Sequence, residues 1–76
     1  MQTQLDTILP SVLLAERKRN SLTRETVAKY VNKSEQLIGK WERGEQSPKI
    51  YPDGVKLAQL FNCSLDYLAG LKENRL

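Results

Sequence analysis

The chain has 76 residues, about the size of one small domain, so we expect a single compact unit with no separate catalytic or ligand-sensing domain. Hydrophobic residues make up 39% and charged residues 28%, which is typical of a soluble globular protein. One cysteine excludes an internal disulfide. The absence of histidine removes the commonest metal ligand and acid-base residue, which argues against an enzyme, a metal site or a bound cofactor.

The formal net charge is +3, from 12 basic and 9 acidic residues, which mildly favours a polyanionic partner without deciding the matter. The first residues carry no basic flank, and the chain contains no long apolar run. We therefore expect a cytoplasmic protein that is neither exported nor inserted in a membrane.

Apolar residues recur at helical spacing near the start of the chain, at Ile8, Leu9, Val12 and Leu13. They predict a first helix from about Ile8 to Arg19, with Asp6 or Thr7 as N-cap and Pro10 inside the first turn. Thr23 is then the expected N-cap of a second helix of about two turns, which buries Val27, Ala28 and Val31.

Asn32 follows the last apolar position of the second helix and is expected to end it in the left-handed conformation. Ser34 is the expected cap of a third helix over residues 35–43, which turns Ile38 and Trp41 inward and ends at Gly44. Two short helices joined by a tight turn form the helix-turn-helix pattern, whose second helix lies in the major groove of DNA.

Residues 45–51 are polar and predict a loop, and Pro52 is placed near the start of a fourth helix. Asn62 is expected to end that helix as Asn32 ends the second. Ser64 is the expected cap of a fifth helix with Leu65, Leu68 and Leu71 along one side. The domain core is thus expected over residues 8–71, with residues 72–76 as a frayed tail.

Several short segments at characteristic spacing resemble the Cro and phage-repressor (Xre-like) helix-turn-helix family. They are Thr23-Arg24-Glu25-Thr26-Val27-Ala28, Trp41-Glu42-Arg43-Gly44, Leu57-Ala58 and Ser64-Leu65-Asp66-Tyr67-Leu68. The resemblance covers roughly residues 9–70. It implies an all-α, five-helix, lambda-repressor-like DNA-binding domain, in which the second and third helices form the helix-turn-helix.

The resemblance also implies an ion pair between Arg17 of the first helix and Glu42, which closes the recognition helix; the alternative is two unrelated surface charges. The chain departs from the family pattern at Arg24, where Gln is usual, at Glu16, where an aliphatic residue is common, and at Asn32 and Asn62, where Gly is common. Extra residues around Tyr51 leave the path of the loop before the fourth helix open.

Four residues on the outward side of the third helix are candidates for contacts to DNA bases: Glu35, Gln36, Gly39 and Lys40. Gln36 suits a bidentate contact to adenine and Lys40 suits the acceptors of guanine. Glu35 could accept a hydrogen bond from cytosine, or simply stabilise the start of the helix through its charge. Leu37 could meet a thymine methyl or pack in the fold, and Gly39 could allow a close approach of either DNA or the second helix.

The candidates for phosphate contacts are Arg24, Lys33, Ser34, Arg43 and Lys49, although a solvated charged face would look similar. Trp41 is expected in the core rather than on a base, because it shares the buried face with Ile38. Cys63 is expected to be a buried, unreactive thiol.

These features favour a transcriptional regulator, most simply a repressor, that reads a pseudo-palindromic double-stranded DNA operator as a homodimer without a small-molecule effector. Tyr67, Leu71 and Leu76 are candidate dimer contacts, although Tyr67 could cover the protein's own core, and pairing only on DNA stays open. The alternative is a protein-interaction module such as an antitoxin, with secondary DNA binding.

Overall fold

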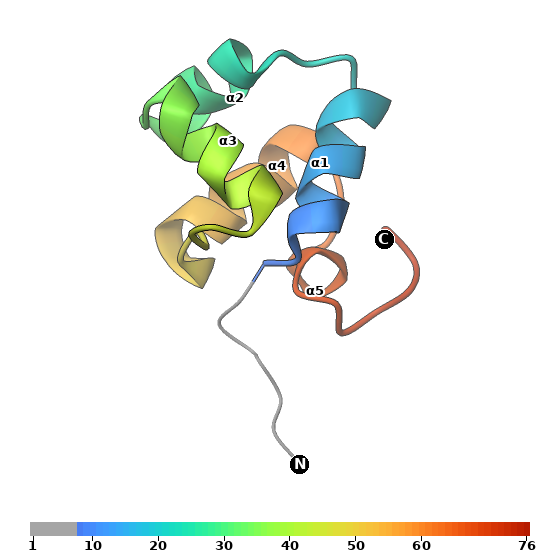
Figure 1. Ribbon diagram of the computed structural model, residues 1–76. Helices are drawn as coiled ribbons and strands as arrows, with labels where there is room; N and C mark the ends of the chain where they lie inside the picture. The colour runs from blue at the N-terminus through green and yellow to red at the C-terminus, as the bar shows by residue number, and fades with distance from the viewer. Residues whose placement is uncertain (1–7) are drawn as a thin grey trace.

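The computed structural model describes residues 8–76, which form short helices joined by turns (Figure 1). Their order is α1 (Pro10–Arg19), α2 (Arg24–Val31), α3 (Glu35–Arg43), η1 (Ile50–Gly54), α4 (Val55–Phe61) and α5 (Leu65–Leu68). No strand occurs within these residues. No helix in the described part of the chain combines the length and apolar character needed to cross a lipid bilayer.

Every α-helix contributes to one hydrophobic core, because each presents an apolar stripe that is removed from water. The core residues are Ile8, Leu13, Val27, Ala28, Val31, Ile38, Trp41, Leu57, Ala58, Phe61, Cys63 and Leu68. Trp41 is 2% exposed, so it is a core residue, as predicted. Since Ile38 and Trp41 anchor α3 against the core, the opposite side of α3 faces solvent.

Side-chain caps begin three of the helices, as the sequence predicts. The hydroxyl oxygens of Thr23, Ser34 and Ser64 accept hydrogen bonds from the backbone N–H groups three residues later, at 3.1, 3.1 and 3.0 Å. Asn32, Gly44 and Asn62 end α2, α3 and α4 with φ of 62°, 80° and 55°. The predicted left-handed ends of these helices are therefore confirmed.

The start of the first helix differs from the prediction. α1 begins at Pro10, two residues later than expected, and its N-cap Leu9 makes no side-chain capping bond. Leu9 is extended and its N–H donates to the carbonyl of Leu68 at 3.0 Å, so a contact with α5 keeps this segment out of the helix. The expected caps, Asp6 and Thr7, lie outside the described residues.

The fourth and fifth helices also differ in detail. Pro52 follows a cis peptide bond and lies within η1, which runs directly into α4. Tyr51, the residue before Pro52, has an extended backbone (φ −124°, ψ 131°). α5 ends at Leu68 after a single turn, because Gly70 turns the chain with a φ of 82°. Leu71 thus lies beyond the helix and is 48% exposed, instead of sharing a helical side with Leu65 and Leu68.

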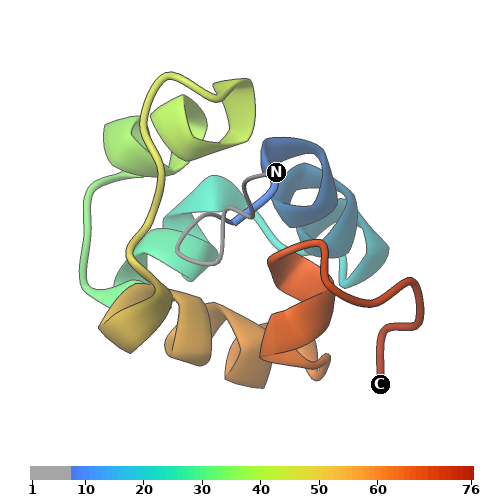
Figure 2. The ribbon, with the colours of Figure 1, turned by 90° about the horizontal axis from the view of Figure 1, so that it is seen from below.

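The prediction of a frayed C-terminal tail is wrong, because Arg75 folds back onto the body of the protein. Its guanidinium donates to both carboxylate oxygens of Glu16 at 2.9–3.1 Å and to the carbonyl of Phe61 at 2.9 Å. The N–H of Ser64 donates to the carbonyl of Arg75 at 2.6 Å. Glu16 is 1% exposed, so the carboxylate on α1 takes its partner from the end of the described chain. Figure 2 shows this segment beside α5, on the side of the molecule away from α3.

Cys63 is buried next to this ion pair, and its thiol is free. Burial raises the pKa of the thiol, and the nearby charge of Glu16 raises it further. Because the thiolate is the reactive form, Cys63 is held as the unreactive thiol that the sequence predicts.

Replacing Arg75 with Ala should destabilise the protein, because it leaves the buried carboxylate of Glu16 without its main partner. We expect thermal unfolding to shift down by at least about 5 °C. The matched control is Arg19→Ala, which removes the exposed partner of Glu16 at 3.6 Å and should change the melting temperature little. Equal melting temperatures for wild type and Arg75→Ala would show that the C-terminal segment is not anchored in solution.

Candidate nucleic-acid interface

The candidate interface is formed by α2, the following turn and α3. The backbone N–H of Lys33 donates to the carbonyl of Ala28 at 2.9 Å, which closes the end of α2. Ser34 then starts α3, and the inward positions Ile38 and Trp41 fix its rotation about its own axis. As a result Glu35, Gln36, Lys40 and Arg43 are exposed.

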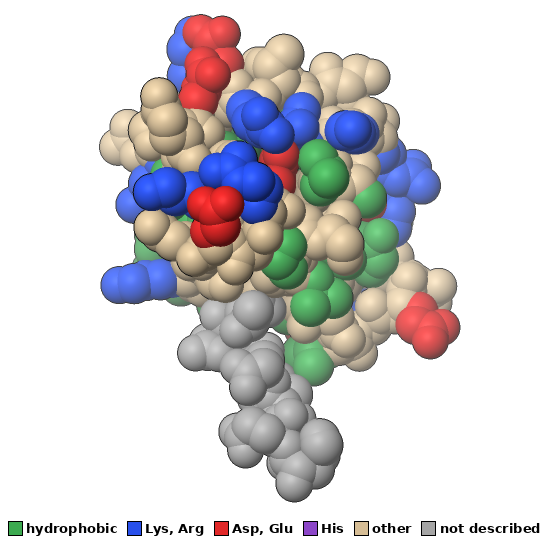
Figure 3. Space-filling view, viewed as in Figure 1, with side chains coloured by type: hydrophobic (Ala, Val, Ile, Leu, Met, Phe, Trp, Pro, Cys, Tyr) green, Lys and Arg blue, Asp and Glu red, His purple; other side chains and the backbone are tan. Residues whose placement is uncertain are grey.

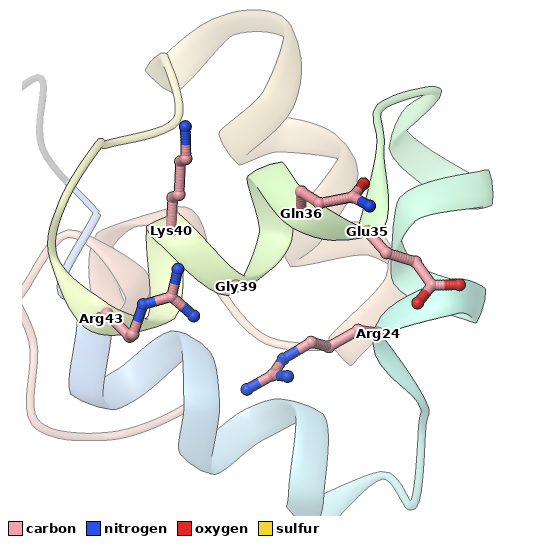
Figure 4. A pocket seen from close by; sticks show the side chains of 6 residues that line it. All are labelled: Arg24, Glu35, Gln36, Gly39, Lys40 and Arg43. Carbon is pink, nitrogen blue, oxygen red and sulfur yellow. The ribbon is translucent and has the colours of Figure 1, made fainter.

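These exposed residues surround a shallow open hollow on the protein surface, which we call the notch. The notch is lined by Arg24, Glu35, Gln36, Gly39, Lys40 and Arg43. All four candidate base contacts are thus brought together with two of the candidate phosphate contacts. The guanidinium groups of Arg24 and Arg43 point toward one another across Gly39, while the Lys40 ammonium points away from them (Figure 4).

The buried carboxylate of Glu42 lies behind the notch and is bound by two arginines. Arg17 donates to it from α1 at 2.5 and 3.2 Å, and Arg24 donates to it from the start of α2 at 3.0 Å. A third donor of Arg17 binds the carbonyl of Leu22 at 2.9 Å. The Glu42 side chain is 2% exposed, so the pair is a buried structural contact rather than two surface charges. Arg24, expected only to bind phosphate, also belongs to this network.

The surroundings of Glu42 determine its ionisation. Burial alone would raise the pKa of Glu42, but hydrogen bonds from Arg17 and Arg24, together with their positive charges, outweigh burial. The pKa therefore lies below its ordinary value of 4.5, and Glu42 is ionised at neutral pH.

Arg43 is held by an acidic residue that the sequence did not single out. Its Nε and Nη2 donate to the two carboxylate oxygens of Glu45, at 2.8 and 3.4 Å. The hydrogen bond from Arg43 lowers the pKa of Glu45, which keeps this carboxylate ionised. Spacing gave no sign of the pair, because the left-handed turn at Gly44 is what brings the two side chains together.

Positive charge extends beyond the notch itself. Figure 3 shows Lys and Arg side chains gathered over α2, α3 and the end of α1, with a few carboxylates among them. Lys33, Ser34 and Lys49 are exposed but do not line the notch. Leu37 is partly buried and packs against the core, which favours the packing alternative for this residue.

Hydrophobic side chains gather over α1 and toward α5 on the same face (Figure 3). Leu9 is 38% exposed, and its side chain lies beside Gly70, the residue that precedes Leu71 in the chain. Leu76 is 72% exposed, whereas Tyr67 is partly buried against the core. Of the candidate dimer contacts, Leu71 and Leu76 are accessible, and Leu9 adds to them.

The family model for the helix-turn-helix matches residues 13–68. The chain belongs to the helix-turn-helix family. It is also similar to the crystal structure of the P22 c2 repressor protein in complex with a synthetic operator, with a TM-score of 0.77 and 28% sequence identity. That similarity covers 86% of this chain and 97% of the repressor chain. No match to a curated protein was found.

These comparisons confirm the predicted resemblance and the all-α helix-turn-helix fold. The matched residues include α2, the turn and α3 in full, so the notch lies within the helix-turn-helix.

Glu42→Gln should destabilise the protein at neutral pH by about 3 kcal/mol, because the half-buried guanidinium of Arg17 loses its charged partner. Since the pKa of Glu42 is lowered on folding, its charge stabilises the fold above about pH 4.5, and this stabilisation is lost as the pH falls below that value. Denaturant unfolding of both proteins at pH 7 and at about pH 3 checks this. Glu45→Gln, in the exposed pair, should have little effect at either pH. A wild-type advantage over Glu42→Gln that stays constant with pH would contradict the assignment.

Proposed function

We propose that this protein is a transcriptional regulator that binds double-stranded DNA in a sequence-specific manner, most simply a repressor, with α3 in the major groove. The observation that carries the proposal is the outward side of α3, where Gln36 and Lys40 are exposed and line the same notch as the cationic side chains of Arg24 and Arg43. The similar P22 c2 repressor is described in complex with an operator, which supports the same role for this chain.

The residues divide by chemistry into those that read sequence and those that bind the DNA backbone. Gln36 and Lys40 offer donors suited to adenine and guanine, and Glu35 offers acceptors suited to cytosine. Lys33, Ser34 and Lys49 lie outside the notch and are proposed to bind phosphates, as are Arg24 and Arg43 on its rim. This regulator would act by binding alone, in the cytoplasm where the DNA is, without a small-molecule effector.

A second copy of the chain would read a second half-site about one turn of DNA away. Leu9, Leu71 and Leu76 offer exposed apolar surface for such pairing. Because none of these three residues lines the notch, two copies could pair through them while each leaves its notch free.

Selecting bound sequences from a random duplex library tests the proposal directly. We expect one preferred sequence with two-fold symmetry, whose half-sites are separated by about 10 base pairs. Enrichment of single half-sites would contradict the proposal of a dimer but would still agree with the proposal of a DNA-binding regulator. Binding without preference among duplexes would contradict the regulator and favour a protein-interaction module.

Gln36→Ala should relax discrimination at one base position of the selected site by about 1–3 kcal/mol. The matched control is Lys33→Ala, which should weaken binding to selected and random duplexes alike and reduce the slope of log K against log salt by about 0.9. Fluorescence anisotropy titrations on single-base variants of the site measure both effects. If Gln36→Ala lowered the affinity for every duplex equally, Gln36 would have no role in sequence recognition.

A further inference from the structure

Gly39 is a glycine that the protein's own packing does not require. It lies in the middle of α3 with ordinary helical backbone angles, where glycine is less favourable than alanine. A Cβ added at this position would meet only the ends of two long side chains: Nη1 of Arg43 at 3.0 Å and Nε of Arg24 at 3.9 Å. No backbone atom of α2 lies within reach, so close packing of α2 against α3 does not explain the glycine.

The space above Gly39 is occupied by the two guanidinium groups. Each is held from behind by a carboxylate: Arg24 through its Nε by Glu42, and Arg43 through its Nε and Nη2 by Glu45. Within residues 8–76, Nη1 of Arg43 and both terminal nitrogens of Arg24 donate no hydrogen bond. The free donors of the two arginines face each other across the notch (Figure 4).

Two guanidinium groups that converge in this way repel each other, and a shared anion offsets the repulsion. A guanine edge takes one arginine in a bidentate contact and carries no net charge. A phosphate offers several oxygens and a negative charge, which suits two arginine forks at once. The notch is therefore better matched to a phosphate than to a base.

We propose that Gly39 keeps the notch open so that Arg24 and Arg43 together bind a single phosphate of the DNA backbone. This proposal rests on the proposed function and adds two details to it. Gly39 is a positioning residue that acts through Arg43, and the two arginines bind one phosphate together instead of one phosphate each. A side chain at position 39 would push the end of Arg43 out of the notch, at little cost to the fold, because that end is flexible.

The first test is Gly39→Ala. We expect its melting temperature to equal or exceed that of wild type, because alanine favours the helix. We expect its affinity to fall on selected and random duplexes alike, with a reduction of up to about 0.9 in the salt slope. The control is Gln59→Ala on the exposed side of α4, which should leave affinity and slope unchanged. Gly39→Ala binding with wild-type affinity and slope would overturn the role of the glycine.

The second test asks whether the arginines share one phosphate, by measuring salt slopes for Arg24→Gln, Arg43→Gln and the double variant. Gln at position 24 can still donate a hydrogen bond to Glu42, and melting temperatures verify folding. A shared phosphate predicts that the double variant loses about 0.9 in slope in total, whereas two separate phosphates predict a loss of about 1.8. A loss of about 1.8 in slope would overturn the proposal of a shared phosphate, but it would still agree with the proposed function as a DNA-binding regulator. Wild type that binds no duplex at any salt concentration overturns both proposals.

Discussion

The buried carboxylate of Glu42 is the contact on which the arrangement of the helix-turn-helix depends. Glu42 lies near the end of α3, and its two partners, Arg17 and Arg24, lie on α1 and at the start of α2. A charge removed from water must be paired, so the three helices can be placed only where both guanidinium groups reach the same carboxylate. The core residues Ile38 and Trp41 set which side of α3 is buried, and Glu42 sets where α3 lies relative to its neighbours.

The same network also prepares the outward surface. Arg24 donates one hydrogen bond through its Nε to Glu42, and among the described residues its other donors remain free in the notch. Arg43 is held in a similar way by its hydrogen bond to Glu45. Long cationic side chains lose considerable freedom when they bind a ligand, and holding them in place beforehand reduces that loss. The carboxylates near the proposed DNA-binding surface therefore do not simply oppose the binding of an anion, since two of them position the arginines that would bind it.

The sequence predicted correctly the features that local interactions determine. The capping of α2, α3 and α5 and the left-handed ends at Asn32 and Asn62 depend on residues within a few positions of one another. The pair of Arg17 and Glu42, 25 residues apart, was expected only through the family resemblance and had no local signal.

The errors at the two ends of the described chain have a common physical cause, which is contact between residues far apart in the chain. α1 starts late because Leu9 bonds to Leu68, and residues 72–76 are held because Arg75 reaches Glu16, 59 positions away. From the sequence, Glu16 stands out only as a departure from the family pattern and Arg75 is expected in a frayed tail, because no local pattern connects the two residues. Glu45 was missed for a related reason, because its pairing with Arg43 depends on the direction of the turn at Gly44.

The departure from the family pattern at Glu16 is explained by the same pair. An aliphatic residue at this buried position would need no partner, whereas a carboxylate there is tolerable only if a cation pairs with it. Arg75 supplies that cation and at the same time binds the carbonyl of Phe61 at the end of α4, which ties the C-terminal segment to α1 and α4 at once. The apolar side chains of Leu71 and Leu76 are thereby carried on an anchored segment, on the side of the molecule away from α3 (Figure 2). A second copy that pairs through them would meet a surface of fixed shape, and its own α3 would be held in a defined orientation for the second half-site. In this protein, therefore, the buried carboxylate of Glu16 fixes the segment that carries the proposed dimer surface.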